Sequence, residues 1–343
     1  KLAYLAPVET TCMAGWDTSP KTMTGSIQCQ GVVPENQCHL LASDLERMTV
    51  REAPSSTLDF RQQVECVMAD IQAFKEEMPG ALPVLINLLP AGPATNLENC
   101  RSLNELYNAV EADIIPDLAY CLAAILSEIP VVNFTPNAIE IPCIINEAVK
   151  RGVPVAGRDG KTGQTYLKVV LASALKARNF TVDGWYSLNI LGNEDGKNLM
   201  DPDNAAGKVA NKTKLLDDIL GYPVGQRYAA PAHKVHIDYY PPRGDAKEAW
   251  DVIDFTGLFD LPMSIRLNLQ GRDSILAAPL VLDLGRWLAA LQQAGRSGPI
   301  PELGFYFKKP VGENPPLTFQ EQVEKLRELE RECDQKLGSE APG

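Results

Sequence analysis

The sequence VVNFTPNAIEIPCIINEAVKRGVPVAGRDG, residues 131–160, has the pattern of a strand, a helix and a second strand. Two short runs rich in valine, 131–133 and 153–155, flank a segment of helical periodicity over 138–150. Gly152 stops that helix just before the second strand. A helix between two short apolar strands is typical of a βαβ unit and favours a parallel sheet.

Similar patterns extend to both sides of this unit. We expect helices over 57–78, 118–129, 161–178, 273–295 and 319–337. We expect further strands over 84–89, 181–191, 235–240 and 263–269. The first half of the chain therefore has an α/β pattern, and the alternating strands beyond residue 180 indicate an α+β segment. Because ligands of parallel sheets bind at the carboxyl ends of the strands, Asn133 and the turn 157–159 are candidate site residues.

The composition excludes several classes of protein. The chain has 343 residues, a formal net charge of −12 and an isoelectric point near 4.9. An acidic chain binds nucleic acid and anionic membranes poorly, and we find no stretch with the ~18 apolar residues of a membrane helix. The eight cysteines include no C-x-x-C pair and are too sparse for a disulfide framework. We therefore expect a cytoplasmic protein that contacts neither nucleic acid nor membrane.

The segment GRDGKTGQTYLK, residues 157–168, has the features of an anion site. A strand end is followed by two glycines, a lysine and the start of a helix. The N–H groups and the dipole at a helix start favour phosphate, and Lys161 adds a full positive charge. The spacing is not that of a P-loop. A capped helix with a solvent-exposed lysine would have the same sequence, so both interpretations stay open on this segment alone.

A second polar turn, LGNEDGKNL at 191–199, precedes several lysines. The polar loops that follow it carry Lys208, Lys212 and Lys247. Ammonium groups that crowd around one substrate lower one another's pKa, which makes a neutral lysine available as a base. Each of these lysines could equally be an exposed surface residue, and the turn could be only a turn.

Taken in order, several blocks resemble those of the myo-inositol-1-phosphate synthases, also called inositol-3-phosphate synthases. AGWD is similar to the family's GGWD, VNFTP to its VNGSP, and GRDGKTGQT to its GDDxKSGQT block. LGNEDGKNL resembles LGNNDGxNL, and GKVANKTKLLDD resembles SKEISKSxVxDD. GDAKEAWD is similar to GDSKVAMDE, and DSILAAPLVLDL to DSLLAAPLIIDL. The glycine before Lys161 and the segment FYFKKP look closer to the archaeal-type branch.

The resemblance implies a Rossmann-like NAD-binding domain interrupted by an α+β domain that carries catalysis and tetramer contacts. Residues 1–156 would form the first part of the dinucleotide-binding domain, 157–262 the α+β domain, and 263–343 the return to the first domain with a C-terminal helix. It also implies a homotetramer that uses NAD to convert D-glucose 6-phosphate into 1L-myo-inositol 1-phosphate, the first step of inositol biosynthesis. The substrate would be oxidised at C5, enolised, cyclised by an intramolecular aldol step and reduced again.

The resemblance also assigns residues to the site. Catalysis would use Lys161, Lys168, Lys197, Lys212, Lys247 and Asp195. NAD binding would use Asp17, Asn133, Thr135, Asp159 and Gly160. An enolate, an alkoxide and a phosphate all need fixed positive charge, so we expect Lys161 and Lys212 to hold phosphate or oxyanion. Lys247 or Lys168 would take part in proton transfer.

The sequence departs from the family pattern in three ways. It contains no glycine-rich loop of the GxGGNNG type, so the NAD domain would lack its first glycine-rich unit, and we expect the chain to be a truncated form of a longer one. Asp238 and Tyr166 stand where eukaryotic relatives carry lysine. Not every lysine of the family's site therefore has a counterpart in this sequence. Two other interpretations stay open: a relative that acts on another phosphosugar, and a catalytically silent relative that binds NAD or phosphate. A divalent or monovalent cation also stays open, because no ligand cluster in the sequence identifies it.

Overall fold

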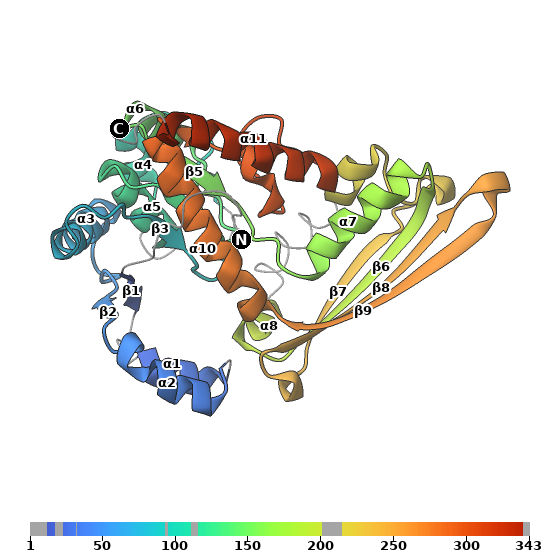
Figure 1. Ribbon diagram of the computed structural model, residues 1–343, viewed down its shortest axis with the longest axis horizontal. Coiled ribbons are helices and arrows are strands. Elements are labelled where there is room, and N and C mark those ends of the chain that lie inside the picture. Colours follow the sequence, from blue (N-terminus) through green and yellow to red (C-terminus); the bar gives the residue numbers. More distant parts are fainter. Residues whose placement is uncertain are drawn as a thin grey trace.

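Two four-stranded sheets joined by long helices form most of the described structure (Figure 1). The computed structural model describes residues 12–17, 23–31, 33–92, 95–110, 116–200 and 215–338. Helices α10 and α11 cross the parallel sheet, and the far end of α11 reaches α7 on the second sheet (Figure 1).

Four parallel strands form the first sheet, in the order β10–β5–β4–β3. The bounds of these strands are β3 Leu85–Asn87, β4 Val131–Asn133, β5 Pro154–Gly157 and β10 Gly298–Pro299. Asn87 lies beside Asn133, and Asn133 lies beside Gly157, so the carboxyl ends of three strands meet at one edge. The parallel sheet expected from the sequence is present.

Helices cover both faces of this sheet. They are α3 Phe60–Glu77, α4 Leu103–Ala109, α5 Pro116–Leu126, α6 Pro142–Lys150, α10 Asp273–Gln293 and α11 Phe319–Gly338. Val131 and Val155 pack into the core formed with α3, α5 and α6. Val132 and Ala156, which point the other way, pack against α10 and α11. The strands are apolar on both faces because helices bury both faces.

The N-terminal part forms a small, separate two-stranded sheet. Strand β1, Ala14–Asp17, lies parallel to β2, Thr49–Glu52, and helices α1 (Met23–Gln30) and α2 (Glu35–Leu45) lie between them in the chain. Trp16 anchors this pair to the rest of the protein. Its indole Nε1 donates to Asp70 at 2.7 Å, and its ring centroid lies 5.2 Å from that of Tyr120.

The second sheet has the order β7–β6–β8–β9. Its strands are β6 Thr181–Leu191, β7 His233–Tyr239, β8 Ala246–Thr256 and β9 Pro262–Arg272. Helix α7, Gln164–Ala177, covers the face that we call the inner face (Figure 1). The short elements α8 (Glu194–Asn198), η1 (Gln226–Tyr228), η2 (Pro241–Arg243), η3 (Leu258–Asp260) and η4 (Pro301–Phe305) lie in the connections.

Helix starts differ from the predicted ones where a cap or a proline fixes them. Helix α3 begins at Phe60 because the Asp59 carboxylate accepts from the Gln62 backbone N–H at 2.9 Å. The Gln62 side chain accepts from the Asp59 N–H in return, which completes a capping box. Helix α6 begins at Pro142 rather than at residue 138, since proline suits a first turn in which its missing N–H has no helical partner.

The second sheet is larger than the sequence predicted. Strand β8 was missed, although it pairs along its length with both β6 and β9. Strand β9 runs from Pro262 to Arg272, so the sheet continues beyond residue 262, and the domain boundaries remain a prediction.

The expectation that no stretch of the sequence is as long and apolar as a membrane helix is wrong for α10. By length and composition it passes the test for a membrane helix. However, Leu284, Trp287 and Leu288 in its second half lie in the core of the described structure, which is typical of a core helix.

Candidate functional site

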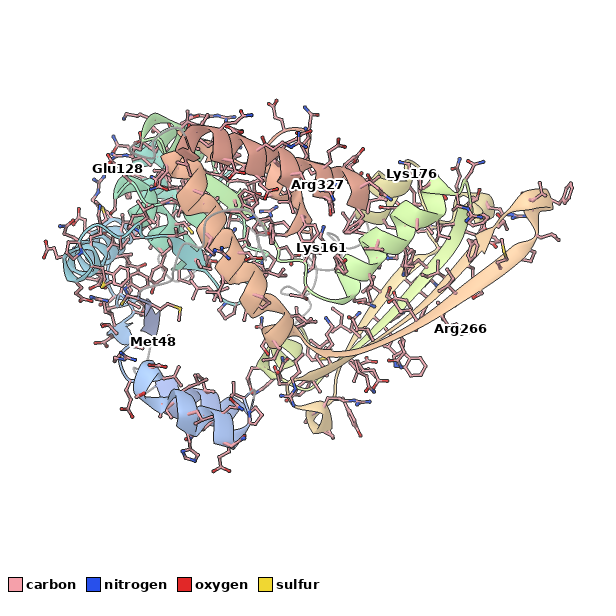
Figure 2. The ribbon with its side chains drawn as sticks, viewed as in Figure 1. Met48, Glu128, Lys161, Lys176, Arg266 and Arg327 are labelled. Carbon is pink, nitrogen blue, oxygen red and sulfur yellow. The ribbon has the colours of Figure 1, made fainter. Side chains whose placement is uncertain are left out.

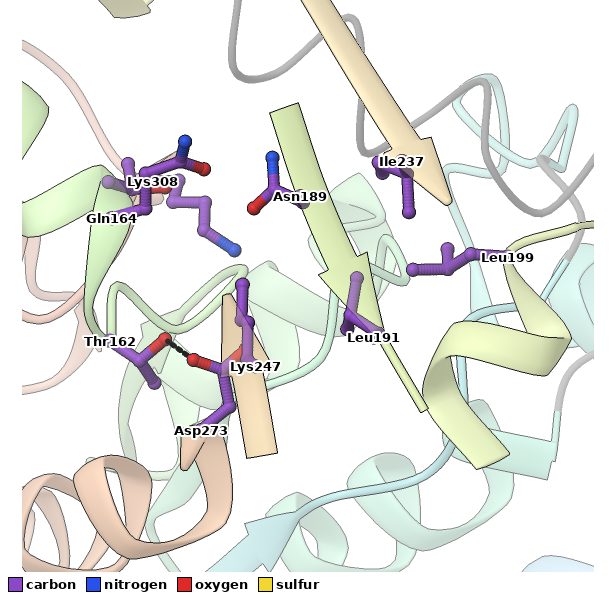
Figure 3. A pocket seen from close by; sticks show the side chains of 10 residues that line it. Thr162, Gln164, Asn189, Leu191, Leu199, Ile237, Lys247, Asp273 and Lys308 are labelled. Atoms are coloured by element: carbon purple, nitrogen blue, oxygen red, sulfur yellow. Dashed lines mark hydrogen bonds and ion pairs between the residues drawn. The ribbon is translucent and has the colours of Figure 1, made fainter. Parts of the chain in front are cut away.

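A small cavity lies between the start of α7, the inner face of the second sheet and the first residue of α10 (Figure 3). Its described lining residues are Thr162, Gln164, Thr165, Asn189, Leu191, Leu199, Ile237, Lys247, Asp273 and Lys308. Its volume of about 50 Å³ holds only a few water molecules. Two ammonium groups and one carboxylate on such a small cavity make it strongly polar.

Lys247 enters the cavity from β8 and is paired with a carboxylate. Its Nζ lies 2.8 Å from Oδ2 of Asp273, whose Oδ1 accepts from the Thr162 hydroxyl at 3.0 Å. Burial alone would raise the pKa of Asp273, but Lys247, Lys308 and the Thr162 hydroxyl outweigh it and hold that pKa below its ordinary value. Asp273 is therefore ionised at neutral pH and is the anion that Lys247 contacts.

Lys308 is the second cation of the cavity. Its Nζ lies 2.6 Å from Oδ1 of Asp159, and its backbone N–H donates to the Asp159 carbonyl at 2.8 Å. Asp159 follows directly after the carboxyl end of β5, so Lys308 connects the cavity to the edge of the parallel sheet. The segment FYFKKP indicated only a family branch in the sequence, and Lys308 was not predicted as a site residue. A lysine pair after an aromatic run was the available signal.

Lys161 lies beneath α11 and is not among the described lining residues (Figure 2). Its Nζ donates to the Gln322 side chain at 2.8 Å and to the Gly304 carbonyl at 3.1 Å, both neutral acceptors. Only 2% of the residue is exposed. Burial, and secondly the charge of Lys308, lower the pKa of Lys161 to about 7. Its predicted contact with phosphate remains a prediction.

Lys168 lies one helical turn beyond Gln164, behind the cavity wall. Its Nζ donates to the Ser187 hydroxyl at 3.2 Å and lies 2.8 Å from Nε2 of His233. Burial lowers the pKa of Lys168 to about 8 even though the charge of Asp251 opposes this. A lysine with this pKa exchanges protons near neutral pH, as the predicted proton-transfer role requires.

Of the remaining predicted catalytic residues, the structure describes the side chain of Lys197. Lys197 is exposed on α8, and its Nζ lies 3.6 Å from the carboxylate of Glu194. The Asp195 side chain and the whole of Lys212 fall outside the described part of the chain. Their roles remain predictions.

The predicted NAD-binding residues lie on strand ends of the two parallel pairings. Asn133 is fully buried, and its Oδ1 accepts from the Thr135 hydroxyl at 2.9 Å and from the Asn87 amide at 3.1 Å. The side chains of Asn133 and Thr135 therefore bond to neighbouring residues of this edge and do not project from it. A Cβ atom at Gly160 would lie 2.2 Å from the ring of Phe134, so only glycine fits there. Asp17 ends β1, and its side chain is outside the described set.

The sequence analysis missed a buried carboxylate at the same edge. Asp117 is 1% exposed, and its Oδ2 accepts from Asn87 at 2.6 Å, Asn137 at 2.9 Å and Thr135 at 3.3 Å. The Asp117 carboxylate therefore links the segments that follow β3 and β4 through hydrogen bonds.

The two positions where eukaryotic relatives carry lysine do not face the cavity. Asp238 pairs in register with Ile190, on the outer face of the sheet. Tyr166 packs its ring against Phe305 and Phe319, with centroids 6.3 and 6.0 Å away. The cations of this cavity therefore do not depend on either position.

A family model described as myo-inositol-1-phosphate synthase matches residues 163–274, the segment from the start of α7 to the start of α10. Over 202 residues the chain is 44% identical to inositol-3-phosphate synthase 1 of Bacteroides thetaiotaomicron. Over this segment the chain is similar to the myo-inositol-1-phosphate synthases. The resemblance recognised from the sequence is thereby confirmed, while the archaeal-type branch remains a prediction.

The chain spans about half the length of the curated relatives it matches. The alignment with the Bacteroides enzyme covers 58% of this chain and 47% of that protein. The inositol-3-phosphate synthase of Dictyostelium discoideum is 31% identical over 237 residues, which are 65% of this chain and 45% of that protein.

Solved structures share the fold over nearly the whole chain. The inositol-3-phosphate synthase of Caenorhabditis elegans has a TM-score of 0.83 at 21% identity, covering 96% of this chain and 73% of that one. A myo-inositol-1-phosphate synthase-related protein of Thermotoga maritima has a TM-score of 0.73 at 20% identity, covering 92% of this chain and 85% of that one. The predicted fold class, a Rossmann-like parallel sheet joined to an α+β part, is confirmed.

Proposed function

We propose that the protein is an NAD-dependent inositol-3-phosphate synthase that converts D-glucose 6-phosphate into 1L-myo-inositol 1-phosphate. The observation that carries this proposal is the meeting of Lys247 and Lys308 at one cavity beside the carboxyl edge of the parallel sheet. The segment matched by the family model, residues 163–274, contains Lys247. A sugar phosphate that is oxidised next to a nicotinamide needs this juxtaposition of cations and strand ends.

The two lysines would hold the anionic groups of the substrate. Each is now neutralised by a carboxylate, Lys247 by Asp273 and Lys308 by Asp159. Binding pockets for small molecules usually measure about 300–1,000 Å³, so this cavity of about 50 Å³ would widen as the substrate enters. The ammonium groups would then turn from the carboxylates toward the phosphate and the developing enolate and alkoxide oxygens.

Proton transfer would fall to groups at and behind the cavity wall. Asp273 accepts from both Lys247 and Thr162, so it would orient Lys247 as an oxyanion partner. Lys168, with a pKa of about 8, would exchange protons with the site through the polar side chains in front of it.

The parallel sheet offers an edge of suitable chemistry for NAD. Gly157 and Gly160 let the backbone approach closely, and Asp159 follows the end of β5. Gly160 and Asp159 would lie nearest the nicotinamide, while Asn133 and Thr135 would hold the loop beside it. NAD, when bound, supplies reversible hydride acceptance at C5 of the sugar. No described group of three or more His, Cys, Asp and Glu side chains could hold a metal ion, so a cation remains a prediction.

We also propose that the protein acts as a homotetramer in the cytoplasm. The outer face of the second sheet, opposite α7, exposes 45% of Tyr186 and 49% of Trp250 next to partly buried Leu188 and Val252. Exposed aromatic patches of this kind mark interfaces. Trp250→Glu would give a smaller species in sedimentation velocity, and an unchanged sedimentation coefficient would remove this face from the assembly.

The proposed activity is tested by incubating the protein with NAD and D-glucose 6-phosphate and following the phosphorus NMR spectrum. We expect the substrate signal to be replaced by that of inositol 1-phosphate, with no net NADH. A different phosphorylated product would favour the other phosphosugar interpretation. Tight NAD or phosphate binding without turnover would favour a silent relative.

A further inference from the structure

Behind the cavity, a buried carboxylate fixes one of the lining side chains. Asp251 lies on β8 with only 2% of its surface exposed. One of its oxygens, Oδ2, accepts from Nε2 of Gln164 at 2.9 Å. The other, Oδ1, accepts from the Trp185 indole at 2.8 Å and from the Ser187 hydroxyl. All four side chains lie on the inner face of the sheet or on the facing side of α7.

The charge of this carboxylate is balanced by Lys168. Ser187 stands between the two groups, since it donates to Asp251 and accepts from Lys168 at 3.2 Å. The ammonium of Lys168 also lies 5.4 Å from the centre of the Trp185 ring. A buried charge is tolerated when it is paired and hydrogen-bonded, as Asp251 is here.

This arrangement decides which end of the Gln164 amide faces the cavity. An ionised carboxylate accepts hydrogen bonds and donates none. Asp251 can therefore be satisfied only by the NH₂ group of Gln164, which leaves Oε1 of Gln164 as the atom available to the cavity. The amide orientation follows from the hydrogen-bond network.

A second acceptor faces the same space. Asn189 lines the cavity and is fully buried, and its Oδ1 has no hydrogen-bond partner among the described residues. Lys308 reaches between Gln164 and Asn189 (Figure 3). The cavity thus presents two acceptors beside two cations, which is the complement of a ligand with hydroxyl groups and one anionic group.

We propose that Asp251 is a positioning residue that sets the hydrogen-bond polarity of the cavity. By holding the NH₂ of Gln164 it presents an acceptor to the ligand, and so selects a polyhydroxylated phosphate over a phosphate without hydroxyl groups. The proposal deepens the proposed function and rests on it for the ligand, D-glucose 6-phosphate.

The test uses Asp251→Asn, with Ser187→Ala as the matched control. In Asp251→Asn the new amide keeps one oxygen for Trp185 and Ser187 and turns its NH₂ toward Gln164, which must rotate and offer its own NH₂ to the cavity. Ser187→Ala removes a donor to Oδ1 of Asp251 and an acceptor of Lys168, but it leaves Oδ2, so Gln164 stays in place. Gln164→Met identifies the Gln164 signal and removes the acceptor directly.

The first readout is the side-chain amide spectrum of protein labelled with ¹⁵N-glutamine. We expect the Gln164 signal to move in Asp251→Asn and to stay in Ser187→Ala. An unmoved signal in Asp251→Asn overturns the proposal. This readout needs no ligand, so it tests Asp251 even if D-glucose 6-phosphate proves not to bind and the proposed function fails.

The second readout is calorimetric affinity for two probes, D-glucose 6-phosphate and inorganic phosphate. Asp251→Asn and Gln164→Met should each weaken the sugar phosphate roughly 10-fold and inorganic phosphate less than about twofold. Equal weakening of both probes would indicate a merely structural role and overturn the proposal. If Asp251→Asn does not fold, Gln164→Met makes the same comparison of the two probes.

Discussion

The buried ammonium of Lys161 gives a prediction with a definite sign. Burial lowers its pKa from 10.5 to about 7 in the folded protein. Between pH 7 and 10.5 the unfolded chain therefore binds more protons than the folded one. Stability rises with pH wherever the unfolded state binds more protons, so Lys161 destabilises the fold most below about pH 7, and this effect is relieved above it.

The size of the effect follows from one proton. A full difference of one bound proton changes the free energy of unfolding by about 1.4 kcal/mol per pH unit. From about pH 7.5 to about pH 9.5 the wild-type protein should thus gain about 2.5 kcal/mol relative to Lys161→Met, which cannot titrate. Methionine keeps the approximate length and volume of the lysine stem.

The assay is urea unfolding followed by tryptophan fluorescence at about pH 7.5, 8.5 and 9.5, the range in which the two states differ by one proton. Lys150→Met, on the exposed end of α6, serves as control and should run parallel to the wild type. If the free energy of unfolding changes equally with pH in Lys161→Met and in the wild type, Lys161 is protonated throughout this range. That result would contradict the prediction.

Three further changes have expected outcomes. Lys308→Met should lower kcat/KM for D-glucose 6-phosphate by about 100-fold or more, measured by product formation, because it removes a cation of the cavity; an unchanged value would place Lys308 outside the site. Asp117→Ala should lower the free energy of unfolding by about 3 kcal/mol, since buried donors each lose an acceptor, among them one N–H of the Asn87 amide; a loss below about 0.5 kcal/mol in urea titration would contradict this. Gly160→Ala should cost about 1–3 kcal/mol in the same titration because the new methyl group overlaps Phe134, and a variant as stable as the wild type would show that the ring moves freely.

Much of the fold was predictable because local patterns determine it. Apolar runs such as 131–133 are buried on both faces, and the alternation over 181–191 matches a strand with one buried face. Strand β8 was not predicted because it contains two buried charged residues, Asp251 and Glu248. Their charges obscure the alternation of apolar and polar residues that is typical of a strand. These buried carboxylates are stabilised by hydrogen-bond partners that come from other parts of the chain, and the sequence alone does not show which residues those are.

The cavity was only partly predictable for the same reason. Lys247 was predicted and lines the cavity, but Lys308 comes from a distant segment, where its signal was a lysine pair after an aromatic run. Lys161 lies beside Gln322 because α11 folds over the turn after β5, and its expected contact with an anion remains a prediction. Local sequence identified the loops, whereas the packing of α10 and α11 decided which ammonium groups meet.

The most direct test of the account is a calorimetric titration of D-glucose 6-phosphate in the presence of NAD. The wild-type protein and Lys150→Met should bind it with equal affinity, and the double variant Lys247→Met/Lys308→Met should bind it at least about 100-fold more weakly, since charge-assisted hydrogen bonds contribute about 1.5–3 kcal/mol each. Equal affinity in the double variant and the wild type would contradict the claim that these two cations hold the sugar phosphate.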